Sequence, residues 1–179
     1  MRENEYGKEY RGFWPLESGD ETQFRKLYDD LAAYLGRYGP FEGLMGFSEG
    51  ASVAATIMVQ EAQRRQHGQS LPHLPIKCGI FFCALPPLQL GDKNSPFGTV
   101  RLLDSEFDGT LLNIPTAHIW SKSGHVSQGM GQILLELSSR ELREEVVHGL
   151  GHDIPGSRSD EGLRESVMVI ERTIERTRT

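Results

Sequence analysis

Apolar residues follow two different spacings along the chain, and these predict helices that alternate with strands. Between residues 21 and 38 they recur every three or four positions, as on one face of an amphipathic helix that ends near Gly39-Pro40. Residues 76–85 are almost continuously apolar, as a parallel strand buried on both faces requires. Further strands are predicted at residues 41–47, 114–120 and 145–148, and further helices at 51–66, 127–140 and 160–172.

The alternation of strands and helices predicts an α/β fold, a mostly parallel sheet flanked by helices. A chain of 179 residues is long enough for one such domain and too short for two. Within the helices, the apolar spacing marks one face of each. These faces carry Ile133, Leu134 and Leu137 in the third helix, and Leu163, Val167, Ile170 and Ile174 in the last.

Two segments fall outside the alternation. Residues 1–19 are an arm containing Phe13 and Trp14, which either packs against the domain or lines a substrate site. Residues 86–113 are a long irregular insertion with two leucine pairs, at 102–103 and 111–112. Long insertions of this kind are often lids, so the leucines predict a lid-like segment that packs down on the domain.

Composition narrows the class of protein. The net charge is −6 and no basic stripe is present, which argues against nucleic acid as a partner. No apolar run is long enough to cross a membrane, and the first residues lack the apolar run of a signal peptide, so the sequence predicts a cytoplasmic protein. Cys78 and Cys83, five positions apart in one strand-like segment, are predicted to be reduced core residues.

The segment Gly46-Phe47-Ser48-Glu49-Gly50 has the G-x-S-x-G pattern of a nucleophile elbow. The pattern alone is weak, but an apolar strand precedes it and an alanine-rich helix follows it, which is the context that an elbow requires. The two flanking glycines are expected to let the chain turn sharply, so that the Ser48 hydroxyl is presented to a substrate. The alternative is an ordinary turn between a strand and a helix.

Among six histidines, His152 is the best candidate for a general base. It lies in the glycine-rich loop 149–155 after the last predicted strand, where an imidazole could reach the elbow. The other histidines fall on strands or in turns elsewhere: His67, His73, His118, His125 and His148.

Three segments together resemble the fungal serine hydrolase family: residues 39–51 around the elbow, the strand 114–120, and Gly151-His152 with the three residues that follow. The resemblance implies an α/β-hydrolase fold, with Ser48 as nucleophile, His152 as base and the backbone N–H of Glu49 as one oxyanion donor. It also implies hydrolysis of an ester or thioester through an acyl-enzyme, without a metal or other cofactor. Several members of the family are thioesterase-like enzymes or small esterases of polyketide gene clusters.

The chain departs from the family pattern in two places. Where the family has its catalytic acid, shortly after the strand 114–120, this chain has Gly124; the lid acids Asp104, Glu106 and Asp108 are the alternatives. Relatives also begin with a strand and an oxyanion loop that would precede Met1, so the fold is expected to be N-terminally truncated. Without that strand, one edge of residues 41–47 would be open, which predicts either a truncated product or a homodimer formed at this edge.

The sequence therefore predicts a serine esterase or thioesterase, with a small-molecule or carrier-bound acyl group as substrate and a polyketide synthase as one conceivable partner. The lid, together with Phe13 and Trp14, is expected to shape an apolar acyl pocket. The second hypothesis, supported by both departures, is a catalytically impaired homologue that binds an acyl ligand or a partner protein.

Overall fold

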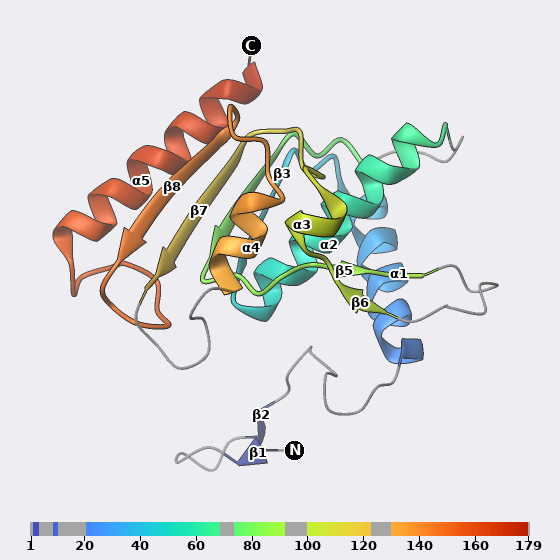
Figure 1. Cartoon of the computed structure of the whole chain (residues 1–179), viewed down its shortest axis with the longest axis horizontal. Coiled ribbons are helices and arrows are strands. Elements are labelled where there is room, and N and C mark those ends of the chain that lie inside the picture. The colour runs from blue at the N-terminus through green and yellow to red at the C-terminus, as the bar shows by residue number, and fades with distance from the viewer. Residues whose placement is uncertain are drawn as a thin grey trace.

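A computed structural model describes residues 2–3, 9–10, 21–68, 74–91, 100–122 and 130–178 of the protein (Figure 1). Its centre is a parallel sheet whose strands follow one another in space as they do in sequence. The strands are β3 (Gly43–Phe47), β4 (Cys78–Phe82), β7 (Thr116–Ser121) and β8 (Arg143–His148). The longer helices are α1 (Glu21–Tyr38), α2 (Glu49–Gln66), α4 (Met130–Glu136) and α5 (Asp160–Glu175).

The remaining elements are short. They are β1 (Arg2–Glu3), β2 (Glu9–Tyr10), β5 (Leu88–Gln89), β6 (Arg101–Leu102), α3 (Ser105–Asp108) and a final 3₁₀ turn, Arg176–Arg178. The parallel sheet with helices between its strands confirms the predicted fold class. None of the helices in the described part of the chain is long and apolar enough to span a membrane.

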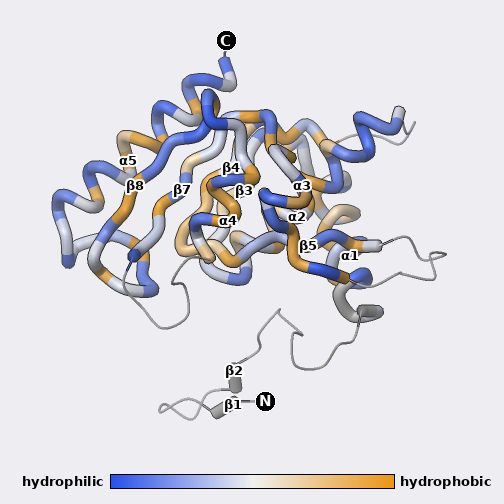
Figure 2. Tube along the Cα trace, in the orientation of Figure 1, coloured by the Kyte–Doolittle hydropathy of each residue, from blue (hydrophilic) through white to orange (hydrophobic). Residues whose placement is uncertain are grey.

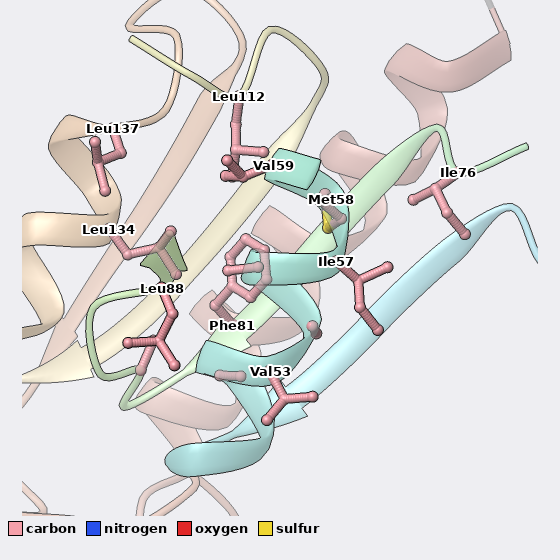
Figure 3. Close-up of a cluster of buried hydrophobic side chains, with 14 of the residues drawn as sticks. Val53, Ile57, Met58, Val59, Ile76, Phe81, Leu88, Leu112, Leu134 and Leu137 are labelled. Carbon is pink, nitrogen blue, oxygen red and sulfur yellow. The ribbon is translucent and has the colours of Figure 1, made fainter. Parts of the chain in front are cut away.

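The hydrophobic core lies on both faces of β4, as its continuous apolar sequence predicts. Phe81 points into the larger cluster, between the sheet and α2, where it lies near Val53 and Ile57 (Figure 3). Ile80 and Phe82 point to the opposite face and join Val169 of α5 in a smaller cluster. The sheet is thus the middle of three layers, and its strands end together at the edge that carries the candidate site.

Helix α5 packs on the sheet through a face different from the one that its apolar spacing marks. Its buried residues are Gly162, Ser166, Val169 and Thr173. Of the predicted apolar face, Ile170 packs partly buried against the smaller cluster, whereas Leu163, Val167 and Ile174 are each about two fifths exposed. Hydrophilic and hydrophobic residues alternate along this helix in Figure 2. The small residues face the sheet because they let the helix approach closely. Ser166 and Thr173 satisfy their hydroxyls by donating to the carbonyls of Gly162 and Val169.

The described part of the insertion, residues 86–91 and 100–113, packs beside α2 and α4. Strands β5 and β6 form a small antiparallel pair, and Leu103 and Leu112 are buried in the main core. Arg101 forms two hydrogen bonds with the carboxylate of Asp108, and Ser105 of α3 donates to Glu136 of α4. The second leucine of each pair therefore anchors the segment as predicted, whereas Leu102 is 42 % exposed and Leu111 is only partly buried.

The outer edge of β3 is open among the described residues, where β3 pairs only with β4. Met45 of β3 is 62 % exposed, although Ile80, which lies beside it on β4, is buried under α5. Helix α5 covers β8, β7 and β4 and stops short of β3. This arrangement agrees with the open edge expected from the sequence, and the homodimer stays a prediction.

Candidate active site

Ser48 lies at a sharp turn between β3 and α2. Its φ of 54° and ψ of −124° put it in a backbone region that residues other than glycine rarely adopt. Its N–H donates to the carbonyl of Phe82 at 2.8 Å, which ties the turn to the end of β4. The Ser48 side chain does not cap α2, so its hydroxyl is left to point elsewhere.

The two glycines of the motif have different roles. A side chain at Gly46 would come within 2.5 Å of the backbone of Gly50 and Ala51, so only glycine lets the start of α2 approach β3. A side chain at Gly50 would meet nothing within 4 Å. The expectation that both glycines are needed for the turn is therefore right for Gly46 and wrong for Gly50.

His152 meets Ser48 across 104 residues of sequence. The Nε2 atom of His152 lies 2.8 Å from the Oγ atom of Ser48, a normal hydrogen-bond distance. The imidazole also packs against the ring of Phe47, with 5.0 Å between ring centroids. The loop that carries His152 turns at Gly151, whose φ is 73°, and the N–H of Asp153 donates to the Gly151 carbonyl.

Glu49 follows as the first residue of α2. Its N–H group therefore lies at a helix N-terminus, where the backbone amides and the helix dipole favour negative charge. The geometry thus places a hydroxyl, an imidazole and a helix N-terminus at one edge of a parallel sheet. This set of groups can carry out acyl transfer.

Comparison with known proteins agrees with this geometry. The family described as serine hydrolase (FSH1) matches residues 2–163. The chain belongs to this serine hydrolase family. Esterase FPY3 of Fusarium mangiferae is 38 % identical over 128 residues, which are 71 % of this chain and 54 % of that protein. Hydrolase phiM of Fungal sp. (strain ATCC 74256) is 30 % identical over 151 residues, 80 % of this chain and 68 % of that protein.

Solved structures place the fold among the hydrolases as well. Acyl-protein thioesterase 2 of Zea mays superposes with a TM-score of 0.54 at 17 % sequence identity, covering 87 % of this chain and 67 % of that chain. At this identity the likeness shows the fold alone. The chain spans about half to two thirds of the length of the curated relatives named above.

The serine hydrolase pattern includes an acid beside the histidine, and the described residues supply none. The Nδ1 atom of His152 is buried and has no hydrogen-bond partner among them. Gly124 lies outside the described residues. Asp104 caps α3 and Asp108 pairs with Arg101, so the two are engaged within the lid; like Glu106, neither contacts His152.

The remaining described histidines lie away from Ser48. His67 is exposed at the end of α2, where its Nδ1 lies 2.7 Å from the carbonyl of Gln63. His118 is buried inside β7 with Nε2 3.0 Å from the Thr116 hydroxyl, and burial lowers its pKa to about 3. His148 ends β8, and burial lowers its pKa too. His73, His125, Phe13 and Trp14 lie outside the described residues.

Sequence reasoning missed two features of the described residues. Cys83 is a free, buried cysteine, as predicted, but it also follows β4 directly with a φ of 46° and contacts the His152 loop, which was not predicted. A groove of about 490 Å³ lies along the lid, lined by apolar side chains together with Arg101 and Asp104. The apolar lining residues are Pro86, Leu102, Leu103, Phe107 and Ile133. No local pattern could reveal either feature, because both depend on segments far apart in sequence.

Proposed function

We propose that this chain is a serine hydrolase that cleaves an ester or thioester through an acyl-enzyme. The observation that carries the proposal is the 2.8 Å distance between Ser48 Oγ and His152 Nε2. At this distance the imidazole can accept the hydroxyl proton while Oγ attacks the substrate carbonyl. The sharp turn at Ser48 and the start of α2 are the arrangement that the nucleophile elbow of α/β-hydrolases requires.

The reaction then has two halves. Attack by Ser48 forms a tetrahedral intermediate whose oxyanion is stabilised by the N–H of Glu49. Its collapse expels the alcohol or thiol, which takes the proton held by His152, and leaves the acyl group on Oγ. Water, deprotonated by His152, then attacks the acyl-enzyme and releases the acid, returning the proton to Ser48.

The groove along the lid is the proposed binding site for the acyl group. Ser52 lies one turn of α2 beyond Ser48, about 6 Å along the helix. Its hydroxyl donates to the carbonyl of Pro86 at 2.6 Å, and Pro86 lines the groove. This bond links the Pro86 end of the groove to the helix that follows Ser48. Its apolar side chains fit a hydrocarbon-like acyl group better than a charged one.

Within this class we favour an acyl chain of secondary metabolism, such as a polyketide acyl group released from a carrier protein. The support is the resemblance of the sequence to hydrolases of such gene clusters, together with the apolar groove. A cytoplasmic location and a polyketide synthase as partner belong to the same proposal. Microscopy of the tagged chain and affinity capture from the producing cells test these two points.

The alternative is a homologue that binds an acyl ligand without turnover. The Nδ1 of His152, which is buried and has no partner among the described residues, supports it, because an imidazolium formed during the reaction would lack a carboxylate from these residues. In a well-studied protease, replacing the triad aspartate by asparagine lowers kcat by about four orders of magnitude. Slow turnover is therefore the expectation for this chain.

Hydrolysis of p-nitrophenyl esters and acyl thioesters of increasing chain length tests the proposal. We expect slow hydrolysis that favours medium or long acyl chains and disappears in Ser48→Ala. Ser105→Ala, which changes a serine of the lid helix that bonds Glu136, should retain it. Hydrolysis that survives Ser48→Ala contradicts the mechanism. Folded wild-type protein that binds acyl ligands but hydrolyses none of them supports the alternative.

A further inference from the structure

Cys83 lies between the two segments that carry Ser48 and His152. It follows β4 directly and is fully buried. The carbonyl of the preceding residue, Phe82, accepts the N–H of Ser48 at 2.8 Å, and the N–H of Cys83 donates to Ile119 of β7, also at 2.8 Å. The peptide that links Phe82 to Cys83 thus joins the elbow to the middle of the sheet.

The Cys83 thiol reaches from this peptide to the His152 loop. Its Sγ atom lies 3.5 Å from the carbonyl oxygen of Asp153, the residue after His152. Burial raises the pKa of the thiol, so at neutral pH it keeps its proton and can donate.

This contact matters because no described residue bonds the second nitrogen of the imidazole. In the tautomer in which Nε2 accepts the Ser48 proton, Nδ1 carries a hydrogen, and no described residue accepts it. The imidazole packs against the ring of Phe47, but this contact does not fix the position of the backbone that carries His152. The position of His152 therefore depends on how its backbone is held.

The backbone at Cys83 is a second observation that favours a role for its side chain. A φ of 46° is unfavourable for any residue with a Cβ atom, and glycine would adopt it without strain. Strained residues of this kind cluster at functional sites. Here the strained residue, Cys83, is also the residue that contacts the His152 loop.

We propose that Cys83 is a positioning residue for the reaction. Its thiol donates to the Asp153 carbonyl and thereby holds His152 at bonding distance from Ser48. This role rests on the proposed hydrolase function, because it is expressed through His152. The contact itself is a property of the fold and can be measured without any substrate.

Two variants separate the hydrogen bond from the packing. Cys83→Ala removes the donor, whereas Cys83→Ser keeps a donor in a side chain of similar size at the same backbone conformation. We expect Cys83→Ala to lower kcat about fivefold with little change in KM, and Cys83→Ser to retain most of the activity. Hydrogen exchange of peptides that cover residues 149–155 should speed up by a similar factor in Cys83→Ala alone.

Equal loss of kcat in both variants, or unchanged kcat and exchange in Cys83→Ala, would overturn the proposal. If the wild-type protein hydrolyses no ester or thioester, the hydrolase function fails. Hydrogen exchange of residues 149–155 then decides by itself whether Cys83 holds the loop. Faster exchange of the loop in Cys83→Ala, restored in Cys83→Ser, then still supports the contact. Unchanged exchange refutes it.

Discussion

At the scale of single residues, Gly46 is a steric requirement of the elbow and Gly50 is not. Gly46→Ala would push a methyl group into the backbone at the start of α2, and overpacking of this kind costs about 3 kcal/mol. We expect this variant to lose that much unfolding free energy in urea titrations, and to lose hydrolysis. Gly50→Ala is the matched control and should stay within about 1 kcal/mol of wild type. Equal effects of the two changes would contradict the close approach of β3 and α2.

His118 makes the stability of the fold depend on pH. Its pKa is lowered to about 3 by burial and, to a smaller extent, by the positive charge of Arg143. In the unfolded chain its pKa is about 6.5, so between these values the unfolded state binds more protons and stability falls as pH falls. Burial lowers the pKa of His148 as well, which adds a change of the same sign.

We expect the free energy of unfolding to be about 2 kcal/mol lower at pH 5 than at pH 7. Urea titrations at the two pH values measure the difference. In His118→Gln the difference should shrink, whatever the absolute stability of that variant. A wild-type stability that is unchanged or higher at pH 5 would show that His118 is not buried in its neutral form.

At the scale of elements, α5 shows where a pattern of apolar residues fails to identify the packed face. The spacing of Leu163, Val167 and Ile174 is helical, yet these residues lie on the flank of the helix. Small residues allow the closest approach to the sheet, so Gly162 and Ser166 face it instead. Hydropathy ranks such residues as weak core candidates, although their buried hydroxyls bond within the helix.

Two valines of α5 provide a direct test of its orientation. Val169 is 3 % exposed and contacts the sheet cluster, whereas Val167 is 43 % exposed. Val169→Ala should lower the unfolding free energy by about 2 kcal/mol through the cavity that it leaves. Val167→Ala should change it by about 0.5 kcal/mol or less. Because both changes have the same effect on helix propensity, the reverse order would mean that α5 packs through the face that its apolar spacing marks.

At the scale of the whole molecule, the edge of β3 that no other described strand pairs with predicts self-association. A strand edge with unpaired backbone groups can pair with another chain, and the exposed Met45 would be covered by such pairing. Light scattering after size exclusion should give twice the chain mass of 20.1 kDa. Met45→Lys should return it to the monomer mass. Met168→Lys, which alters a methionine of α5 that is 42 % exposed, should not. A wild-type monomer at high concentration would contradict the prediction.

Much of this architecture could be predicted because its signals are local. The apolar run of β4, the helical spacing of α1 and the motif around Ser48 each lie within one short segment. The loop position of His152 follows from its place after the last strand. The groove, the contact of Cys83 and the unpartnered Nδ1 of His152 depend on how distant segments meet. Periodicity within one element does not encode them.

The central claim is that Ser48 is a nucleophile activated by His152, and covalent labelling with a fluorophosphonate tests it most directly. Intact mass and peptide mapping should show one adduct on Ser48. The adduct should be absent in Ser48→Ala and should form at least a hundredfold more slowly in His152→Gln. Folded wild-type protein that gains no adduct, or gains it on another residue, would contradict the claim.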